Sequence, residues 1–488
     1  MTDRLLFEIS RPGRVGVSLT EPDNTVPLPE LLPGVALREE LRLPEVAQLD
    51  VVRHFVRLSQ KNFSIDTNFY PLGSCTMKYN PKIHEDVVRL DGFAHLHPAQ
   101  DEDDVQGALR LMAELEGYLA EIAGMKAVSL QPAAGAHGEL TGVLIMRAFH
   151  RERGDAARRR ILVPDSAHGT NPATAAICGY EVTPVRSDER GGVDLGDLAS
   201  KLGSDVAGLM VTIPSTLGLF DEGIATVADM VHRSGGLVYC DGANLNAVVG
   251  RARFGDLGGD IMHFNLHKTF TTPHGGGGPG AGPVAVRADL ERYLPVPRIV
   301  PHLDREGAYT CETARPLSVG RVRSFFGNFG MLVRAYTYIR MLGSSGLADV
   351  SGCAVLNANY LRVRLSDVYD VPYDRICMHE FVMSARRQKA ANGVRALDIA
   401  KRLIDFGYHP PTIYFPLVVE EALMIEPTET ENRETLDAFV ETMRRIATEA
   451  GETPEVLQEA PHGTPVRRLD EVTAARRPNV RYQAAATT

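Results

Sequence analysis

The sequence predicts an α/β protein with a mostly parallel sheet, because short apolar runs alternate with segments of helical spacing through the middle of the chain. The runs recur between residues 127 and 264, and each is followed by a loop and then by a helical segment. Alternation of this kind is typical of a sheet that helices cover on both faces. Farther along, the pattern changes to that of a smaller α+β domain.

Composition narrows the class of protein. The chain has 488 residues, of which 44% are hydrophobic and 23% are charged, and its formal net charge is −10. These values are typical of a soluble globular protein of several domains and give no footprint for nucleic acid. The N-terminus lacks an apolar secretory segment, so we expect a cytoplasmic protein. Six cysteines without a C-x-x-C pair argue against a zinc ribbon or a disulfide scaffold.

Residues 1–103 are expected to form an extended N-terminal arm. They are irregular and rich in proline, for example at 28–33 and 70–81. Such an arm either wraps another subunit or lies along the surface, and the sequence leaves both open. The stretch 68–81 is dense in Tyr, Ser, Thr, Asn and Lys, which are residue types that line sites.

Residues 104–345 are predicted to form the large α/β domain. A helix over 104–123 shows apolar residues at three- and four-residue spacing and ends before Gly124. The other predicted elements are strands at 127–130, 160–163, 180–185, 206–212, 236–241 and 260–264, and helices at 139–150 and 328–342.

Residues 346–488 are predicted to form the smaller C-terminal α+β domain. Its tail, residues 451–488, is polar and contains proline and arginine, so we expect it to run along the surface or to be poorly ordered. The predicted elements are strand-like segments at 375–383, 416–419 and 422–425, and helices at 396–406 and 432–450.

Five candidate functional residues lie at or just after the ends of predicted strands. Ligands of parallel sheets bind beyond the carboxyl ends of the strands, so these residues are expected to converge on one pocket. They are Gly135, His168, Thr212, Asp241 and Lys268.

Lys268 and Asp241 suit an enzyme that holds pyridoxal phosphate (PLP). The cofactor needs a lysine amine for a Schiff base and an anionic carboxylate at its pyridinium nitrogen. A lone lysine after an apolar strand is more often a surface residue, and it is the neighbouring strand ends that favour the cofactor. The small residues of 131–138 precede a helix, whose free amides suit a phosphate.

Several separated motifs together resemble one family, the P-protein of the glycine cleavage system, or glycine dehydrogenase (decarboxylating). The resemblance covers residues 65–385 and implies a PLP-dependent transferase of fold type I. The motifs are Tyr70–Lys78, Gln131–Glu139, Asp165–Ala173, Ile213–Thr216, Tyr239–Asn244 and Asn265–Phe270, with the glycine run of Gly275–Pro279.

Chain length adds to what the resemblance implies. The family occurs either as one chain of about twice this size or as two homologous subunits. A chain of this length that carries the lysine resembles the cofactor-bearing β subunit, subunit 2. Its implied partners are the α subunit, subunit 1, in an α2β2 assembly, and the lipoylated H-protein.

The resemblance also implies roles for individual residues. Lys268 would form the Schiff base, and Asp241 would pair with the pyridinium nitrogen. His168 would stack on the ring, with His137 as the rival. The phenolic oxygen would receive a hydrogen bond from Thr212 or from its neighbour Thr216. The other expected contacts to PLP are the amides of Ala134, Gly135 and Ala136, assisted by His267, together with Ala243 and, across a subunit interface, the glycine run 275–278.

The implied reaction is decarboxylation of glycine with transfer of the aminomethyl group to the lipoyl arm of the H-protein. CO2 is released, the lipoyl disulfide is reduced, and no nicotinamide is required. No G-x-G-x-x-G follows a strand. Candidates for the glycine carboxylate, by residue type only, are Arg321, Arg323 and Arg375.

Three other hypotheses stay open beside this one. The chain could be another fold type I PLP enzyme, an aminotransferase or an amino-acid decarboxylase, or a non-catalytic scaffold subunit that completes its homologue's site. A zinc site at His263 and His267 is disfavoured, because the two histidines lack further ligands at a suitable spacing. We interpret His379 and Glu380 as part of a strand, without a role in metal binding.

Overall fold

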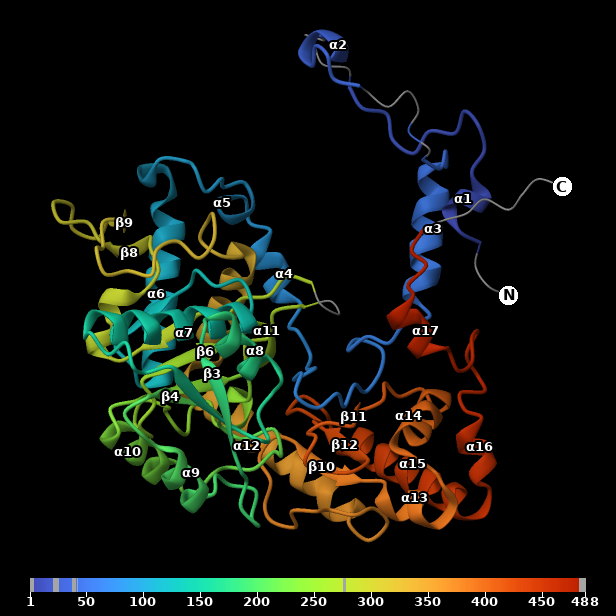
Figure 1. The fold of residues 1–488 in the computed structure, drawn as a ribbon. Coiled ribbons are helices and arrows are strands. Elements are labelled where there is room, and N and C mark those ends of the chain that lie inside the picture. The colour runs from blue at the N-terminus through green and yellow to red at the C-terminus, as the bar shows by residue number, and fades with distance from the viewer. Residues whose placement is uncertain (1–3, 21–25, 37–40, 42, 275–277, 482–488) are drawn as a thin grey trace.

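The computed structural model describes residues 4–20, 26–36, 41, 43–274 and 278–481. A large lobe holds a seven-stranded sheet and a smaller lobe holds a three-stranded sheet, and the N-terminal helices α1 to α3 stand away from both lobes (Figure 1). Among the described helices, none is long and apolar enough to cross a membrane.

The large sheet is mostly parallel, as predicted. Its strand order is β1-β7-β6-β5-β4-β2-β3, and only β7 runs antiparallel to its neighbours. Strand β7, which pairs with β1 and β6, was not among the strands predicted from the sequence. The strands are β1 (Ala127–Ser129), β2 (Arg160–Pro164), β3 (Glu181–Val185), β4 (Val206–Thr212), β5 (Leu237–Gly242), β6 (Ile261–Phe264) and β7 (Val284–Val286).

Helices cover both faces of this sheet, because successive side chains of a strand point to opposite sides. In β5, Val238 and Cys240 join one apolar core, and Leu237 and Tyr239 join the other. The first core is closed by α6 (Gln106–Ala123), α10 (Ile224–Arg233) and part of α12 (Phe329–Leu365), and the second by α7 (Gly135–Glu152) and α8 (Thr170–Ile177). The remaining elements of this lobe are α9 (Leu195–Lys201), η2 (Leu245–Ala247), α11 (Leu266–Thr269), η3 (Ala288–Tyr293) and the hairpin of β8 (Arg298–Pro301) and β9 (Tyr309–Glu312).

Helix α12 connects the two lobes. Its regular geometry is interrupted at Gly343, where φ is 63° and ψ is −171°, a conformation that glycine adopts without a steric cost. The helix contributes Leu332 to the core of the large lobe and Leu361 to that of the small lobe. The boundary at residue 346 stays a prediction.

The small lobe is built on the antiparallel sheet β10-β12-β11. The predicted strand at 416–419 is wrong: the segment is a turn closed by the Val419 amide, which donates to the Pro416 carbonyl, and its Leu417 is 86% exposed. The elements are β10 (Phe381–Ser384), β11 (Thr412–Ile413), β12 (Ala422–Ile425), α13 (Arg386–Asn392), α14 (Ala396–Asp405), α15 (Arg433–Glu452), α16 (Pro454–Gln458) and α17 (Glu471–Arg476).

The segment before residue 104 contains more regular structure than the sequence indicated. Helix α3 (Gln48–Ser59) has twelve residues, and its apolar side chains face outward. The other elements are α1 (Leu6–Ile9), α2 (Leu28–Leu31), α4 (Ile83–Val88), α5 (Asp91–Ala94) and η1 (Glu102–Val105). Helix α4 packs against α12, so the later part of the predicted arm belongs to the body of the molecule.

Candidate active site

One cavity of about 230 Å³ lies at the carboxyl ends of β4, β5 and β6, next to the start of α7. Apart from His137, the rival for the stacking role, and the glycine run, it brings together the residues that the sequence singled out for the cofactor. These residues are Ala134, Gly135, Ala136, His168, Thr212, Thr216, Asp241, Ala243, His267 and Lys268.

Lys268 lies on α11, directly after β6, and is half-buried. Its Nζ donates to the carbonyl oxygen of Ser74 at 2.6 Å. Ser74 has a φ of +67°, in the left-handed region that residues other than glycine rarely adopt. The amine is therefore positioned by a strained loop from the N-terminal part of the chain.

Two buried carboxyl groups of the small lobe hold this loop. Glu380 accepts a hydrogen bond from the Ser74 amide at 2.7 Å, and Glu426 accepts one from the Thr76 amide at 2.9 Å. Both glutamates are fully buried. Burial, followed by the charge of Glu426, raises the pKa of Glu380, and burial raises the pKa of Glu426 to about 7. The prediction that His379 and Glu380 lie in a strand is wrong: both precede β10, and Glu380 helps to position the loop that contacts Lys268.

Asp241 ends β5 and is 2% exposed. Its Oδ2 accepts from Asn171 at 3.0 Å, and its Oδ1 accepts from the Ala243 amide at 2.9 Å. Burial pushes the pKa of Asp241 upward, but His263 and these hydrogen bonds outweigh it and hold the pKa below its ordinary value. The cavity wall therefore contains an ionised carboxylate.

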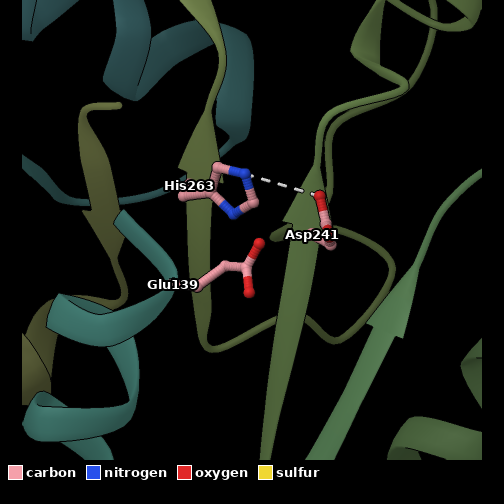
Figure 2. Close-up of side chains that lie close together, drawn as sticks. All are labelled: Glu139, Asp241 and His263. Carbon is pink, nitrogen blue, oxygen red and sulfur yellow. Dashed lines mark ion pairs between the residues drawn. The ribbon is translucent and has the colours of Figure 1, made fainter. Parts of the chain in front are cut away.

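A histidine lies behind this carboxylate. His263 Nε2 is 3.4 Å from Asp241 Oδ1 (Figure 2), and His263 Nδ1 is 2.6 Å from the Tyr239 hydroxyl oxygen. Burial lowers the pKa of His263, so the ring is neutral and carries one proton. A carboxylate can only accept, which places that proton on Nε2 and makes Tyr239 the donor to Nδ1. These contacts, from Tyr239 through His263, orient the Asp241 carboxylate.

Figure 2 also shows Glu139, whose carboxyl group points toward Asp241 and His263. Their ligand atoms lie within 4.8 Å of one another. The Glu139 oxygens contact Thr170 and Thr174, so all three side chains have protein partners. His267, the other half of the disfavoured zinc pair, stacks instead on His274, with ring centroids 4.4 Å apart.

The start of α7 forms one end of the cavity. The helix begins at Gly135, four residues before its predicted start, so Ala136 lies in its first turn. Backbone amides at a helix N-terminus favour a negative charge. A Cβ at Gly135 would meet Asn265 Oδ1 at 2.2 Å, so a larger residue here would displace the Asn265 side chain from the cavity wall.

The threonine and histidine alternatives differ in their surroundings. The hydroxyl of Thr212 is buried and has no hydrogen-bond partner among the described residues, whereas that of Thr216 donates to the Ser166 carbonyl. Thr212 is the free donor. His168 lines the cavity, while His137 accepts from the Ala133 amide at 3.2 Å and is not among the lining residues.

The structure brings none of the three arginine candidates into the wall of this cavity. Arg375 donates to the carbonyl groups of Arg190 and Phe220, Arg323 donates to Asn328, and Arg321 lines a different cavity. Residues 275–277 of the glycine run lie outside the described residues. Wall residues that the sequence analysis did not assign to the cofactor are Ser74, Glu139, Thr170, Asn244, His263, Asn265 and His274.

Comparisons with known proteins support one family. The C-terminal domain of glycine dehydrogenase matches residues 350–462, and the class-V aminotransferase family matches residues 144–294. A probable glycine dehydrogenase (decarboxylating) subunit 2 of Desulforamulus reducens is 59% identical over 484 residues, which cover 98% of this chain and 99% of the relative. One from Exiguobacterium sibiricum is 60% identical over 481 residues, covering 98% and 97%.

Solved structures share the fold at lower identity. The crystal structure of an inhibitor-bound glycine decarboxylase (P-protein) of the glycine cleavage system is 20% identical, with a TM-score of 0.71, and covers 86% of this chain and 93% of its own. A cysteine desulfurase from Thermococcus onnurineus is 16% identical, with a TM-score of 0.60 and coverages of 78% and 95%. At these identities the likeness shows the fold alone.

Proposed function

The chain belongs to the glycine dehydrogenase (decarboxylating) subunit 2 family, and from this membership we propose that it binds PLP and decarboxylates glycine. The structural likenesses confirm the predicted fold type I architecture. One observation carries the proposal: the Lys268 amine and the ionised Asp241 carboxylate line the same cavity, with the N-terminus of α7 beside them.

The residues of the cavity fit the cofactor. Lys268 offers the amine for a Schiff base, and Asp241 offers the anion that a protonated ring nitrogen needs. The unpartnered hydroxyl of Thr212 suits the phenolic oxygen, and the first turn of α7 suits the phosphate. His168 lines the cavity where a ring would stack.

The protein's own groups prepare this chemistry. Bound PLP supplies the electron sink for the carbon that remains when glycine loses CO2. Asp241 keeps a proton on the ring nitrogen, and His263 holds Asp241 in place. The Ser74 carbonyl fixes the Lys268 amine at the cavity wall. Preorganised charges of this kind commonly account for much of an enzyme's rate enhancement.

The aminomethyl group is then transferred to the lipoyl disulfide of the H-protein. We also propose a cytoplasmic α2β2 assembly with subunit 1, the partner that the names of the relatives imply. The outward apolar face of α3 supports an interface with a second chain.

The test uses the chain co-expressed with subunit 1. Exchange of labelled CO2 into the carboxyl group of glycine, dependent on lipoylated H-protein, is the expected result. Transfer of glycine's amino group to a keto acid would favour an aminotransferase instead. A purified complex without cofactor absorbance would favour the scaffold hypothesis.

A further inference from the structure

A buried carboxyl group beside the cavity has no role in the chemistry described so far. Glu139 is 4% exposed, and its oxygens lie 2.8 Å from Thr170 Oγ1 and 3.2 Å from Thr174 Oγ1. Burial, followed by the charge of Asp241, raises the pKa of Glu139 to about 7. A substantial fraction of Glu139 therefore holds a proton at neutral pH.

The surroundings of Glu139 explain why it, and not Asp241, takes the proton. Two carboxyl groups this close cannot both ionise without mutual repulsion. Asp241 accepts from an amide and an asparagine and faces His263, whereas Glu139 contacts only hydroxyl groups. Lys268 opposes the rise in the pKa of Glu139, while Tyr239 keeps its proton because burial raises its pKa.

Thr170 connects Glu139 to His168. Its hydroxyl oxygen is 2.8 Å from His168 Nδ1, and its backbone amide donates to the same nitrogen at 3.3 Å. An amide can only donate, so Nδ1 is an acceptor and the neutral ring carries its proton on Nε2. Burial lowers the pKa of His168, which agrees with a neutral ring.

The Thr170 hydroxyl has one proton and two neighbours, so the direction of these contacts depends on whether Glu139 is protonated. When Glu139 is ionised, Thr170 donates to it. When Glu139 is protonated, it can donate to Thr170, and the Thr170 hydroxyl then donates to His168 Nδ1. The protonated form therefore gives the order Glu139 to Thr170 to His168.

We propose that Glu139, Thr170 and His168 form a proton relay that serves the transfer of the aminomethyl group, a proposal that rests on the proposed function. In that step a carbon–sulfur bond forms at one sulfur of the lipoyl disulfide, and the sulfur–sulfur bond breaks with its electron pair on the other sulfur. The disulfide is reduced and the glycine carbon is oxidised. The released sulfur takes the Nε2 proton of His168, the Thr170 proton moves to Nδ1, and the Glu139 proton moves to Thr170.

Glu139 and Thr170 are thus positioning residues that act through His168. The rate of aminomethyl transfer to lipoylated H-protein, measured with the PLP-loaded complex, should fall as the pH rises through about 7, because Glu139 loses its proton. Glu139→Gln keeps a donor to Thr170 but cannot titrate. We expect a rate about 100-fold lower without that pH step.

Thr170 supplies the matched variants. Thr170→Val should lower the rate about 100-fold, and Thr170→Ser should restore it to within a few-fold. Thr141→Val is the control, because Thr141 is a buried threonine of α7 whose hydroxyl donates only to the His137 carbonyl of its own helix. It should transfer at the wild-type rate.

Two results would overturn the relay: wild-type transfer by Thr170→Val, or a pH step that persists in Glu139→Gln. If Thr170→Val fails to bind PLP, the pH profile of Glu139→Gln decides alone. Failure of the proposed function looks different, because the unaltered complex would then show neither cofactor absorbance nor lipoyl-dependent exchange.

Discussion

At the scale of single residues, the site depends on where each carboxyl group holds or gives up its proton. Asp241 is ionised because donors surround it, while Glu139, Glu380 and Glu426 have raised pKa values because burial is not offset to the same degree. The cavity wall thus holds the carboxylate of Asp241 and the acid of Glu139, while Glu380 and Glu426 hold the Ser74 loop beside it. Chemistry that needs both an anion and a proton source can use such a set.

Asp241→Asn tests the anion. The amide cannot hold a proton on the ring nitrogen, so we expect kcat for lipoyl-dependent exchange to fall at least about 100-fold, with cofactor still bound. Asp256→Asn is the control, because that carboxylate is 56% exposed and pairs with Arg253. Equal rates for the two variants would contradict the role of Asp241.

Glu426 and Glu429 are three residues apart, but their substitution should affect thermal stability differently. One change should weaken the pH dependence of the Tm, and the other should lower the Tm at neutral pH. The pKa of Glu426 rises on folding from 4.5 to about 7, so folding takes up a proton and stability falls as the pH rises through this window. Glu426→Gln removes the titrating group. Its Tm should therefore fall less than that of the wild type between about pH 5 and about pH 8.

Glu429→Gln instead leaves Lys78, with only 1% of its side chain exposed, without its charge partner at 2.7 Å. Removing one member of a buried pair costs about 3–5 kcal/mol, so its Tm should fall at neutral pH. Calorimetry measures the Tm of both variants and of the wild type across this pH range. A Tm for Glu426→Gln that tracks the wild type across the pH range would contradict the assignment.

At the scale of elements, the start of α7 is the part of the cavity that tolerates least change. Gly135→Ala would drive a Cβ into Asn265, so we expect weaker cofactor binding, measured by titrating the apoenzyme. Gly117→Ala in α6 meets open space and should stabilise the helix by about 0.5–1 kcal/mol. Equal cofactor affinity for both variants would exclude a tight fit at Gly135.

The sequence predicted the longer elements, and it predicted the site residues that lie at the ends of strands. The parallel strands and α6 were predictable from apolar runs and helical spacing, and Asp241 and Lys268 from their places at strand ends. Strands of three residues are too short to show a period, so β1 was predicted only from its apolar run and β7 was missed. The contact of Glu380 with the Ser74 loop joins residues 306 positions apart, and no local pattern reports such a contact.

At the scale of the whole molecule, α3 presents an apolar face that stays exposed among the described residues of the single chain. Leu49, Val52, Phe55 and Val56 are each 48–57% exposed, and the helix stands away from both lobes (Figure 1). A cluster of exposed apolar side chains on one helix is typical of an interaction site. We interpret the face as a contact for subunit 1.

Phe55→Glu should therefore weaken co-purification with subunit 1 without unfolding the chain. Gln48→Glu adds the same charge at the exposed start of α3 and should leave the assembly intact. Size-exclusion chromatography of the co-expressed subunits reports the difference. Normal assembly of Phe55→Glu would place the interface elsewhere.

The central claim is that Lys268 carries the cofactor, and borohydride reduction of the purified complex tests it most directly. Reduction turns a Schiff base into a stable amine, so peptide mass spectrometry should find the pyridoxyl phosphate group on Lys268, and Lys268→Ala should lose both the adduct and the cofactor absorbance. An adduct on a different lysine, or none in a complex that decarboxylates glycine, would contradict the account.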